Sequence, residues 1–207
     1  MSFTDPVPWS ALPGWLQVSP CEIVASLSGF ASVYLTVRNK VGLWPAGIVS
    51  VLCYAWLFYS VKLYPDMVLQ VLFLGLSVQG WLRWGRETNH DSSIKILRWG
   101  QALILLVALG AVYLATGTFF ARITQSALPW WDSAILVLSL FAQGLLTYHY
   151  RENWYLWIAV DLLALYVYSA KELYLTLILY ALFLVMAVIG CVEWHRRTAK
   201  YPTPTRS

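Results

Sequence analysis

Three side chains with useful chemistry share one stripe of an apolar segment. In ENWYLWIAVD, residues 152–161, Trp154, Trp157 and Asp161 are spaced at i, i+3 and i+7. A helix turns about 100° per residue, so the three fall within about 60° of arc. Indole faces can stack on a flat ring, and a carboxylate can bind a cation, a proton or hydrogen-bond donors. The stripe is either the wall of a binding site or a packing and anchoring surface.

Asp161 favours the binding site. It lies near the middle of an apolar span predicted at 154–170, and no Lys or Arg occurs at comparable depth in any span. A carboxylate at a helix centre in a bilayer costs roughly 2.5–3.5 kcal/mol, so such a residue is functional by default. The alternative is a structural hydrogen bond between helices. Trp154, at the span end, could be an interface anchor, and Tyr168 continues the face of Asp161.

Amides are the other polar groups within the apolar spans. Gln70 and Gln143 can reach inward as donors and acceptors, and each fits helix–helix hydrogen bonding as well as it fits ligand binding. The chain has no H-E-x-x-H, Walker or G-x-S-x-G motif, and its three Cys lack metal-ligand spacing. We therefore expect no catalytic residues, no metal and no cofactor, and a protein that is not an enzyme.

Composition sets the class of protein that must position these groups. The 207 residues are 59% hydrophobic and 12% charged, with a mean hydropathy of +0.62. Soluble domains carry about 25% charged residues, so the sequence predicts an all-α polytopic membrane protein that forms a single transmembrane domain over 1–207. The net charge of +4 is scattered among the spans and does not indicate a nucleic-acid partner. The partner is the lipid bilayer.

Seven apolar spans can be drawn along the chain. They run over 22–38, 43–60, 64–84, 100–121, 131–149, 154–170 and 173–194. An odd number of spans places the termini on opposite sides of the membrane. With these spans, three Lys or Arg fall on the N-terminal side and eleven on the other. Because cytoplasmic loops are enriched in basic residues, this asymmetry predicts an external N-terminus, a cytoplasmic C-terminus and a main cytoplasmic loop at 85–99.

The chain also matches itself at an offset of 110. Residues 63–84 and 173–194 are identical at nine of 22 positions, including paired Gly-x-x-x-Trp endings at Gly80 and Gly190. The sequence predicts two parallel three-helix units, 22–84 and 131–194, joined by a linker helix at 100–121, with a binding site between the units. Chance similarity between apolar helices is the alternative.

The offset of 110 residues divides the stripe into a residue that has a like counterpart in the other half and two residues that have none. Trp154 lies over Trp44, whereas Trp157 and Asp161 lie over Gly47 and Val51. A purely structural anchor should look alike in both copies. Trp157 and Asp161 are therefore specialisations of one half and the better candidates for substrate recognition.

Three motifs link this sequence to a known family. They are E-N-W-x-x-W-x-x-x-D at 152–161, W-W-D-S at 130–133, and L-Q-V at 69–71 followed by Gly80-Trp81. With them the chain resembles, over nearly its whole length, the PnuC family of bacterial vitamin transporters. The resemblance implies a SWEET-like arrangement (3+1+3) of seven helices in a homotrimer of the inner membrane. It also implies import of nicotinamide riboside by facilitated diffusion, with trapping by a separate cytoplasmic kinase.

The resemblance implies site residues as well. By matching position Gln70, Trp154, Trp157 and Asp161 would line the substrate site, with aromatic faces on the nicotinamide ring and polar groups on the sugar hydroxyls. We include Asn153, from the same motif, and Gln143 among the substrate-binding candidates.

One departure keeps the substrate open. In the nicotinamide riboside branch the motif ends in Asn, whereas this sequence has Asp161. A carboxylate suits the ring cation of nicotinamide riboside, but thiamine is also an aromatic cation, and related branches carry thiamine or riboflavin. A second alternative is proton-coupled uptake with Asp161 as the carrier. A membrane enzyme or a structural subunit is the third, and the lack of a partner base near Asp161 argues against the enzyme.

Overall fold

The computed structural model describes residues 20–60, 64–86, 94–123, 128–170 and 174–200. These residues form seven α-helices joined by short turns, with one isolated β-bridge between Lys95 and Tyr150. The helices are α1 (Pro20–Val37), α2 (Leu43–Ser60), α3 (Tyr64–Trp84), α4 (Trp99–Ile123), α5 (Pro129–Thr147), α6 (Asn153–Ala170) and α7 (Tyr174–Lys200). The predicted all-α fold is confirmed. The N-terminal 19 residues and residues 87–93 of the predicted loop at 85–99 lie outside the described residues.

Among the described helices, five are long and apolar enough to cross a membrane. They are Pro20–Val37, Leu43–Ser60, Trp99–Arg122, Pro129–Thr147 and Leu177–Lys200. The two others, α3 and α6, carry the polar side chains Gln70, Gln79 and Asp161, which lower their hydropathy. The chain is therefore a helical membrane protein, and α3 and α6 hold all of the candidate site residues except Gln143, which lies on α5.

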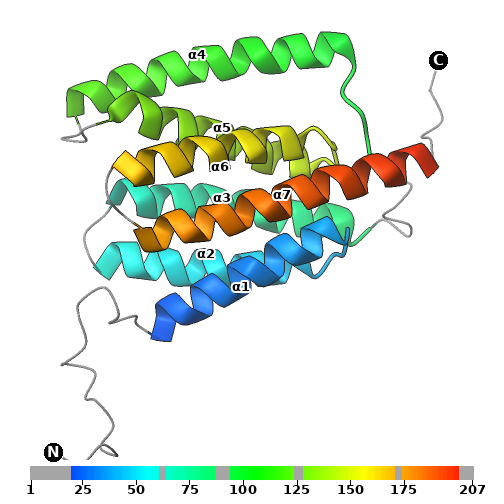
Figure 1. Ribbon diagram of the computed structural model, residues 1–207, viewed down its shortest axis with the longest axis horizontal. Coiled ribbons are helices and arrows are strands. Elements are labelled where there is room, and N and C mark those ends of the chain that lie inside the picture. The colour runs from blue at the N-terminus through cyan, green and yellow to red at the C-terminus, as the bar shows by residue number, and fades with distance from the viewer. Residues whose placement is uncertain (1–19, 61–63, 87–93, 124–127, 171–173, 201–207) are drawn as a thin grey trace, which may run out of the picture.

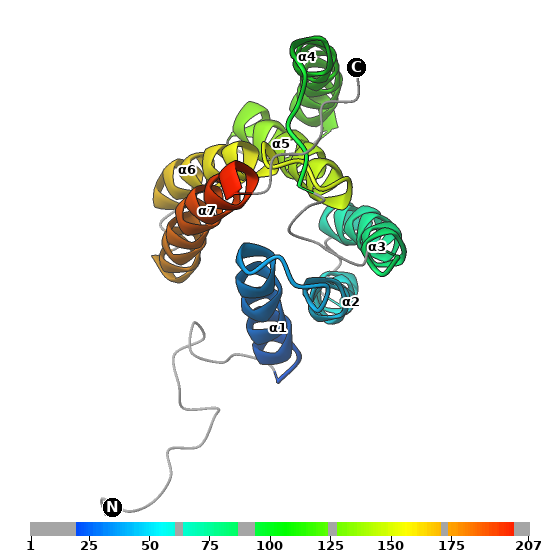
Figure 2. The same cartoon turned by 90° about the vertical axis from the view of Figure 1, so that its right-hand side faces the viewer.

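Six helices form a ring, and α4 stands outside it. Around the ring α1 packs on α2 and α7, α3 packs on α2 and α5, and α6 packs on α5 and α7. Figure 2, seen along the bundle, shows these six helices in a ring with α4 on its outer side. Among the described helices, α4 packs against α5 alone (Figure 1). Its outward side chains are strongly exposed, as in Trp99 at 93% and Ile104 at 71%, which suits contact with an apolar environment.

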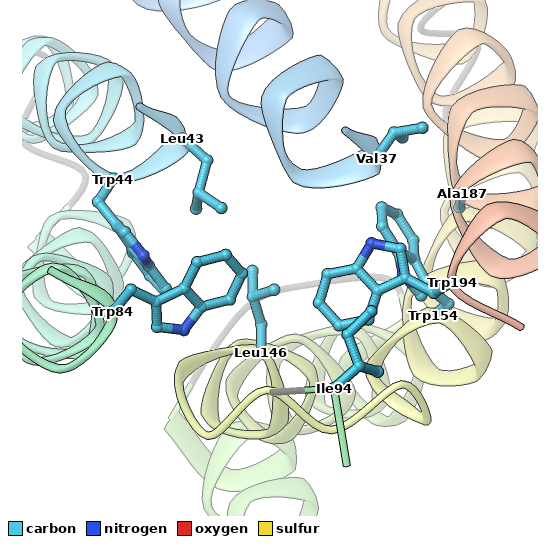
Figure 3. Packing of buried hydrophobic residues seen from close by; sticks show 9 residues of the cluster. All are labelled: Val37, Leu43, Trp44, Trp84, Ile94, Leu146, Trp154, Ala187 and Trp194. Carbon is cyan, nitrogen blue, oxygen red and sulfur yellow. The ribbon is translucent and has the colours of Figure 1, made fainter. Parts of the chain in front are cut away.

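The main buried cluster lies where the α1–α2 and α5–α6 turns meet the ends of α3 and α7. Its members are Val37, Leu43, Trp44, Trp84, Ile94, Leu146, Trp154, Ala187 and Trp194 (Figure 3). In this view the pairs Trp44–Trp84 and Trp154–Trp194 lie on opposite sides of the cluster. The core of the protein is thus concentrated at one end of the bundle.

The two turns at this end have the same backbone geometry, 110 residues apart. Five amide-to-carbonyl hydrogen bonds occur in both turns at corresponding positions. In the first turn they are Arg38→Tyr34, Asn39→Thr36, Lys40→Leu35, Leu43→Lys40 and Trp44→Val41, at 2.9–3.1 Å. In the second they are Tyr148→Gly144, His149→Leu146, Tyr150→Leu145, Asn153→Tyr150 and Trp154→Arg151, at 2.9–3.2 Å. The turns correspond even though the spans before them match only weakly in sequence.

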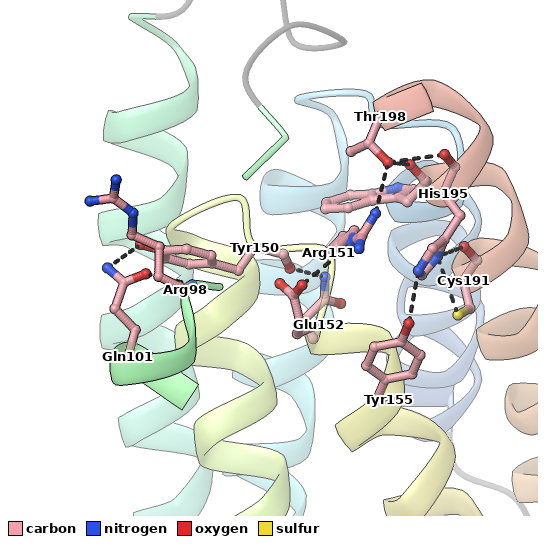
Figure 4. A network of polar contacts seen from close by, with 11 residues as sticks. Arg98, Gln101, Tyr150, Arg151, Glu152, Tyr155, Cys191, His195 and Thr198 are labelled. Carbon is pink, nitrogen blue, oxygen red and sulfur yellow. Dashed lines mark hydrogen bonds and ion pairs between the residues drawn. The ribbon is translucent and has the colours of Figure 1, made fainter. Parts of the chain in front are cut away.

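Helix α7 continues beyond the predicted end at residue 194. Its extension is held by α6 and by the turn before it (Figure 4). His195 Nδ1 donates to the Cys191 carbonyl at 2.7 Å, so its Nε2 accepts from the Tyr155 hydroxyl at 2.8 Å. Arg151 Nη1 donates to Thr198 Oγ1 at 3.2 Å. The extension is polar, and hydropathy alone could not place its end.

Candidate substrate site

Helix α6 places Trp157 and Asp161 on its inner side. Asp161 is buried, with 4% of its surface exposed, and Trp157 is partly buried against the main core cluster. The two residues are one turn apart, which corresponds to a rise of about 6 Å along the helix. The predicted stripe therefore faces the interior of the ring, where a charged group needs polar partners.

Tyrosine side chains lie on the side of α6 that carries Asp161. Tyr180 of α7 stacks on Tyr168 of α6, with ring centroids 5.2 Å apart and planes 26° apart, and their hydroxyls hydrogen bond. Asp161 and Tyr54 of α2 both lie in the neighbourhood of the Tyr180 hydroxyl. The Tyr54 hydroxyl also shares a 3.0 Å hydrogen bond with Ser26. The buried carboxylate thus belongs to a group of phenol hydroxyls from α2, α6 and α7.

Further aromatic rings extend from Tyr180 and Tyr54 across the bundle. Tyr180 meets Phe183 edge-on at 6.1 Å, and Phe183 lies 5.0 Å from Phe30 of α1. On α2, Tyr54 stacks on Phe58 at 5.9 Å. Rings and hydroxyls together suit a ligand that has both a flat ring and polar groups.

Tyr54 and Tyr180 were missed in the sequence analysis, although one signal was available for Tyr180. At the offset of 110 residues, Tyr180 occupies the position of Gln70, which was itself a candidate. A polar residue at the same place in both halves is the pattern to look for. Tyr54 has no such signal, because Ala164 occupies its counterpart position.

Trp154 is a packing residue in this structure. It is 2% exposed and meets Trp194 edge-on, with centroids 5.8 Å apart and planes 83° apart. A β-carbon added to Gly190 would collide with its ring. Trp154 therefore faces the bundle interior instead of the membrane interface, and the interface-anchor alternative does not describe it.

The first half repeats this packing. Trp44 meets Trp84 edge-on at 5.4 Å and 85°, and its ring lies where a β-carbon on Gly80 would be. The paired Gly-x-x-x-Trp endings of the sequence are thereby explained. Each glycine leaves room for a tryptophan of the preceding helix, and each terminal tryptophan meets that ring edge-on.

Asn153 lies at the buried start of α6. Its Nδ2 donates to the Tyr150 carbonyl at 2.6 Å, while its Oδ1 is buried without a hydrogen-bond partner among the described residues. The same holds for the indole N–H of Trp154. Eight residues separate Asn153 from Asp161, a rise of about 12 Å along the helix. The structure therefore sets Asn153 at the turn and not beside the carboxylate.

The two glutamines lie on the side of the bundle where α3 meets α5. Gln143 of α5 donates to Ser77 Oγ of α3 at 3.4 Å, and Thr147 donates to the Leu76 carbonyl at 3.2 Å. This contact agrees with the helix–helix alternative for Gln143. Gln70 is half-buried on α3, two turns before Ser77, so it lies on the same side of its helix.

A helical membrane protein whose interior carries a buried carboxylate, amides and aromatic rings has the features of a transporter for a small solute. Residues 19–196 match the family described as nicotinamide mononucleotide transporter, and the chain belongs to this family, of which the PnuC proteins are members. The resemblance to PnuC proteins found in the sequence is confirmed.

Individual relatives give the same result. The nicotinamide riboside transporter PnuC of Escherichia coli is 25% identical over 208 residues, covering 87% of each chain. That of Neisseria mucosa is 28% identical over 195 residues, covering 86% of this chain and 73% of the relative. The riboflavin/roseoflavin transporter RibM of Streptomyces davaonensis is 24% identical and covers 88% of each. A crystal structure of the vitamin B3 transporter PnuC superposes with a TM-score of 0.71 at 26% identity, over 86% of this chain and 81% of the other.

Proposed function

We propose that this protein imports nicotinamide riboside, a vitamin B3 precursor, across the bacterial inner membrane. The observation that carries the proposal is the buried Asp161, which lies one turn from Trp157 and in the neighbourhood of the Tyr180 hydroxyl, inside a member of this transporter family. Transport is by facilitated diffusion, and a separate cytoplasmic kinase traps the product. No energy-coupling motif is present in the sequence, which supports a passive mechanism.

In this proposal each candidate has a role. Trp157 stacks on the pyridinium ring, and Asp161 balances the ring cation. Gln70 and the hydroxyls of Tyr168 and Tyr180 bind the ribose. Asn153 Oδ1 and the Trp154 indole N–H, both buried without partners among the described residues, accept and donate hydrogen bonds as the substrate passes toward the turns. Gln143 contributes least to the substrate contacts, because its amide already donates to Ser77.

We further propose that the fold is the 3+1+3 arrangement, with parallel units at 22–84 and 131–194 and a linker at 100–121. Three observations support it: the five repeated hydrogen bonds, the two Gly–Trp packings, and the helix contacts α3–α5 and α1–α7, which exchange when the units are exchanged. All seven helices then cross the membrane, with the N-terminus outside and the C-terminus inside. The exposed apolar face of α4 is available for a homotrimer.

Binding to the purified protein distinguishes the vitamins. Nicotinamide riboside, thiamine and riboflavin are titrated into the same preparation, and Trp157→Ala and Asp161→Asn are compared with the parent. We expect nicotinamide riboside to bind and both variants to weaken it. The similarity to RibM keeps riboflavin as an alternative, and thiamine shares the ring cation. If both variants bind every vitamin as the parent does, the site is elsewhere.

Proton-coupled uptake is the second candidate, because a buried carboxylate can carry a proton. Uptake is measured with and without a protonophore, in cells that contain the trapping kinase and in proteoliposomes without it. Facilitated diffusion predicts an unchanged initial rate in proteoliposomes. A rate that falls when the proton gradient is collapsed would favour Asp161 as a proton carrier.

A further inference from the structure

Asn39 and His149 have an unusual backbone conformation that is shared at corresponding positions. Within the described residues they are the two non-glycine residues with positive φ, at 55° and 64°. Each stands two residues after the end of a helix, α1 and α5, and they are 110 positions apart. Glycine adopts this conformation at lower cost than either residue. Asn and His are among the non-glycine residues that adopt this conformation most often, and unlike glycine each brings a polar side chain to its turn.

The two side chains contact one another. His149 Nε2 and Asn39 Oδ1 share a hydrogen bond of 3.2 Å, and the residues are 1% and 3% exposed. Since these positions correspond in the two proposed units, a contact between them lies on the axis that relates the units. The terminal tryptophans Trp84 and Trp194, also 110 positions apart, meet in the same way with centroids 6.3 Å apart. Two contacts between corresponding residues thus lie at one level of the bundle.

Ring stacking joins these contacts into one layer. The His149 imidazole stacks on Trp84 at 3.4 Å with planes 10° apart, and Trp194 lies 6.0 Å from the same imidazole. The Trp194 indole N–H donates to the Thr36 carbonyl at 3.0 Å, which ties α7 to the end of α1. We call Asn39, His149, Trp84 and Trp194 the axial layer. Both indole side chains are 0% exposed, so solvent does not reach the tryptophans of this layer.

The axial layer lies between the candidate site and the end of the bundle that is formed by the α1–α2 and α5–α6 turns. Trp154, which meets Trp194, is seven residues before Asp161, a rise of about 10 Å. Sites between two repeated units open alternately by movement of one unit against the other. We propose that the axial layer is the seal that closes the substrate path at the end formed by the α1–α2 and α5–α6 turns. Separation of Asn39 from His149, and of Trp84 from Trp194, is the movement that releases substrate.

This inference rests on the proposed transport function, so its test includes a readout that needs no substrate. The variants are Asn39→Gly and His149→Gly, which keep the left-handed backbone and remove the contact. The reporter is Ser77→Cys, at a buried position on α3, in a background with Cys21, Cys53 and Cys191 replaced by Ser. A membrane-impermeant maleimide is applied from the side of the turns in oriented vesicles. The control is Thr198→Ala, a buried polar position at the same end of the bundle but outside the layer.

Loss of the seal should raise the rate at which the reporter is labelled by up to about tenfold. The free energy of an ordinary hydrogen bond changes the equilibrium between the closed and open forms of the layer by about that factor. Thr198→Ala should leave the rate unchanged. Equal rates in Asn39→Gly, His149→Gly and the parent would overturn the seal. If labelling rises but no vitamin is transported by the parent, the seal stands and the proposed substrate is wrong.

A second measurement replaces the contact between the two side chains by a metal bridge. Asn39→Cys and His149→Cys are combined in the same background, and Cd²⁺ is added to bridge the two thiolates. Protection of both thiols from alkylation reports the bridge, and uptake should then stop and return when a chelator is added. Unaltered uptake with the bridge in place, or thiols that are never protected, would each contradict the proposal.

Discussion

The ring of Trp154 occupies the space in which a side chain on Gly190 would lie, and Trp44 does the same at Gly80. The two glycines belong to α7 and α3, the two tryptophans to α6 and α2. Each pair therefore sets how closely the last helix of a half approaches the helix before it. Because Trp44 has no counterpart to Asp161 on its helix, this packing does not require a substrate.

Gly190→Ala and Gly80→Ala should destabilise the fold. The added methyl group collides with a buried indole, and overpacking of this kind costs about 1–3 kcal/mol. Thermal unfolding of the purified protein in detergent measures the loss. Gly75→Ala and Gly144→Ala are the matched controls, since a β-carbon at either position meets no other group within 4 Å. The controls should be neutral or slightly stabilising, and an equal loss in all four variants would contradict the packing argument.

Asp161→Asn should weaken the binding of cationic vitamins more than that of neutral ones. A hydrogen bond or contact to a charged group contributes about 1.5–3 kcal/mol, so we expect roughly a 10- to 100-fold loss for nicotinamide riboside. Riboflavin, which is neutral, should be little affected. Titration calorimetry with both ligands measures the difference. Asp132→Asn, in the first turn of α5, is the control. A similar change in affinity for both ligands would show that Asp161 does not distinguish cationic from neutral ligands.

Trp157→Ala should reduce vitamin affinity, and Trp157→Phe should restore part of it. The ring provides a stacking surface, and an aromatic pair contributes about 0.5–1.5 kcal/mol beyond the area that it buries. Trp56→Ala is the control, since Trp56 is a tryptophan of α2 that is 64% exposed. Equilibrium binding to the detergent-solubilised protein is the measurement. Equal affinities for the Ala and Phe variants would indicate that Trp157 supports the fold without contacting the ligand.

Tyr180→Phe tests the hydroxyl group that the sequence analysis missed. The ring and its stacking on Tyr168 are kept, while the hydroxyl that bonds to Tyr168 and lies in the neighbourhood of Asp161 is removed. A single neutral hydrogen bond contributes about 0.5–1.5 kcal/mol, so we expect roughly a 3- to 10-fold loss of nicotinamide riboside affinity. Free nicotinamide, which lacks the ribose, should bind the variant and the parent alike. Tyr59→Phe, at an exposed position of α2, should change neither.

The sequence by itself determined which segments are helical. Each helix is a run of apolar residues that satisfies its backbone hydrogen bonds internally, and this depends on local composition alone. The order α1 to α7 therefore follows the predicted spans closely, except for the polar end of α7, where contacts to Tyr155 and Arg151 extend the helix. Local composition also marked Asp161 as unusual, because a carboxylate is costly in any apolar span.

Only the tertiary structure decided which of these side chains meet. Gln143 reaches Ser77, Tyr180 joins Tyr168 near Asp161, and Asn39 meets His149 across 110 positions of the chain. Such contacts depend on the rotation of each helix about its axis and on the approach of neighbouring helices, which the glycines at 80 and 190 permit. A hydropathy pattern shows where a polar residue lies along a helix, but not which residue of another helix it contacts in the fold.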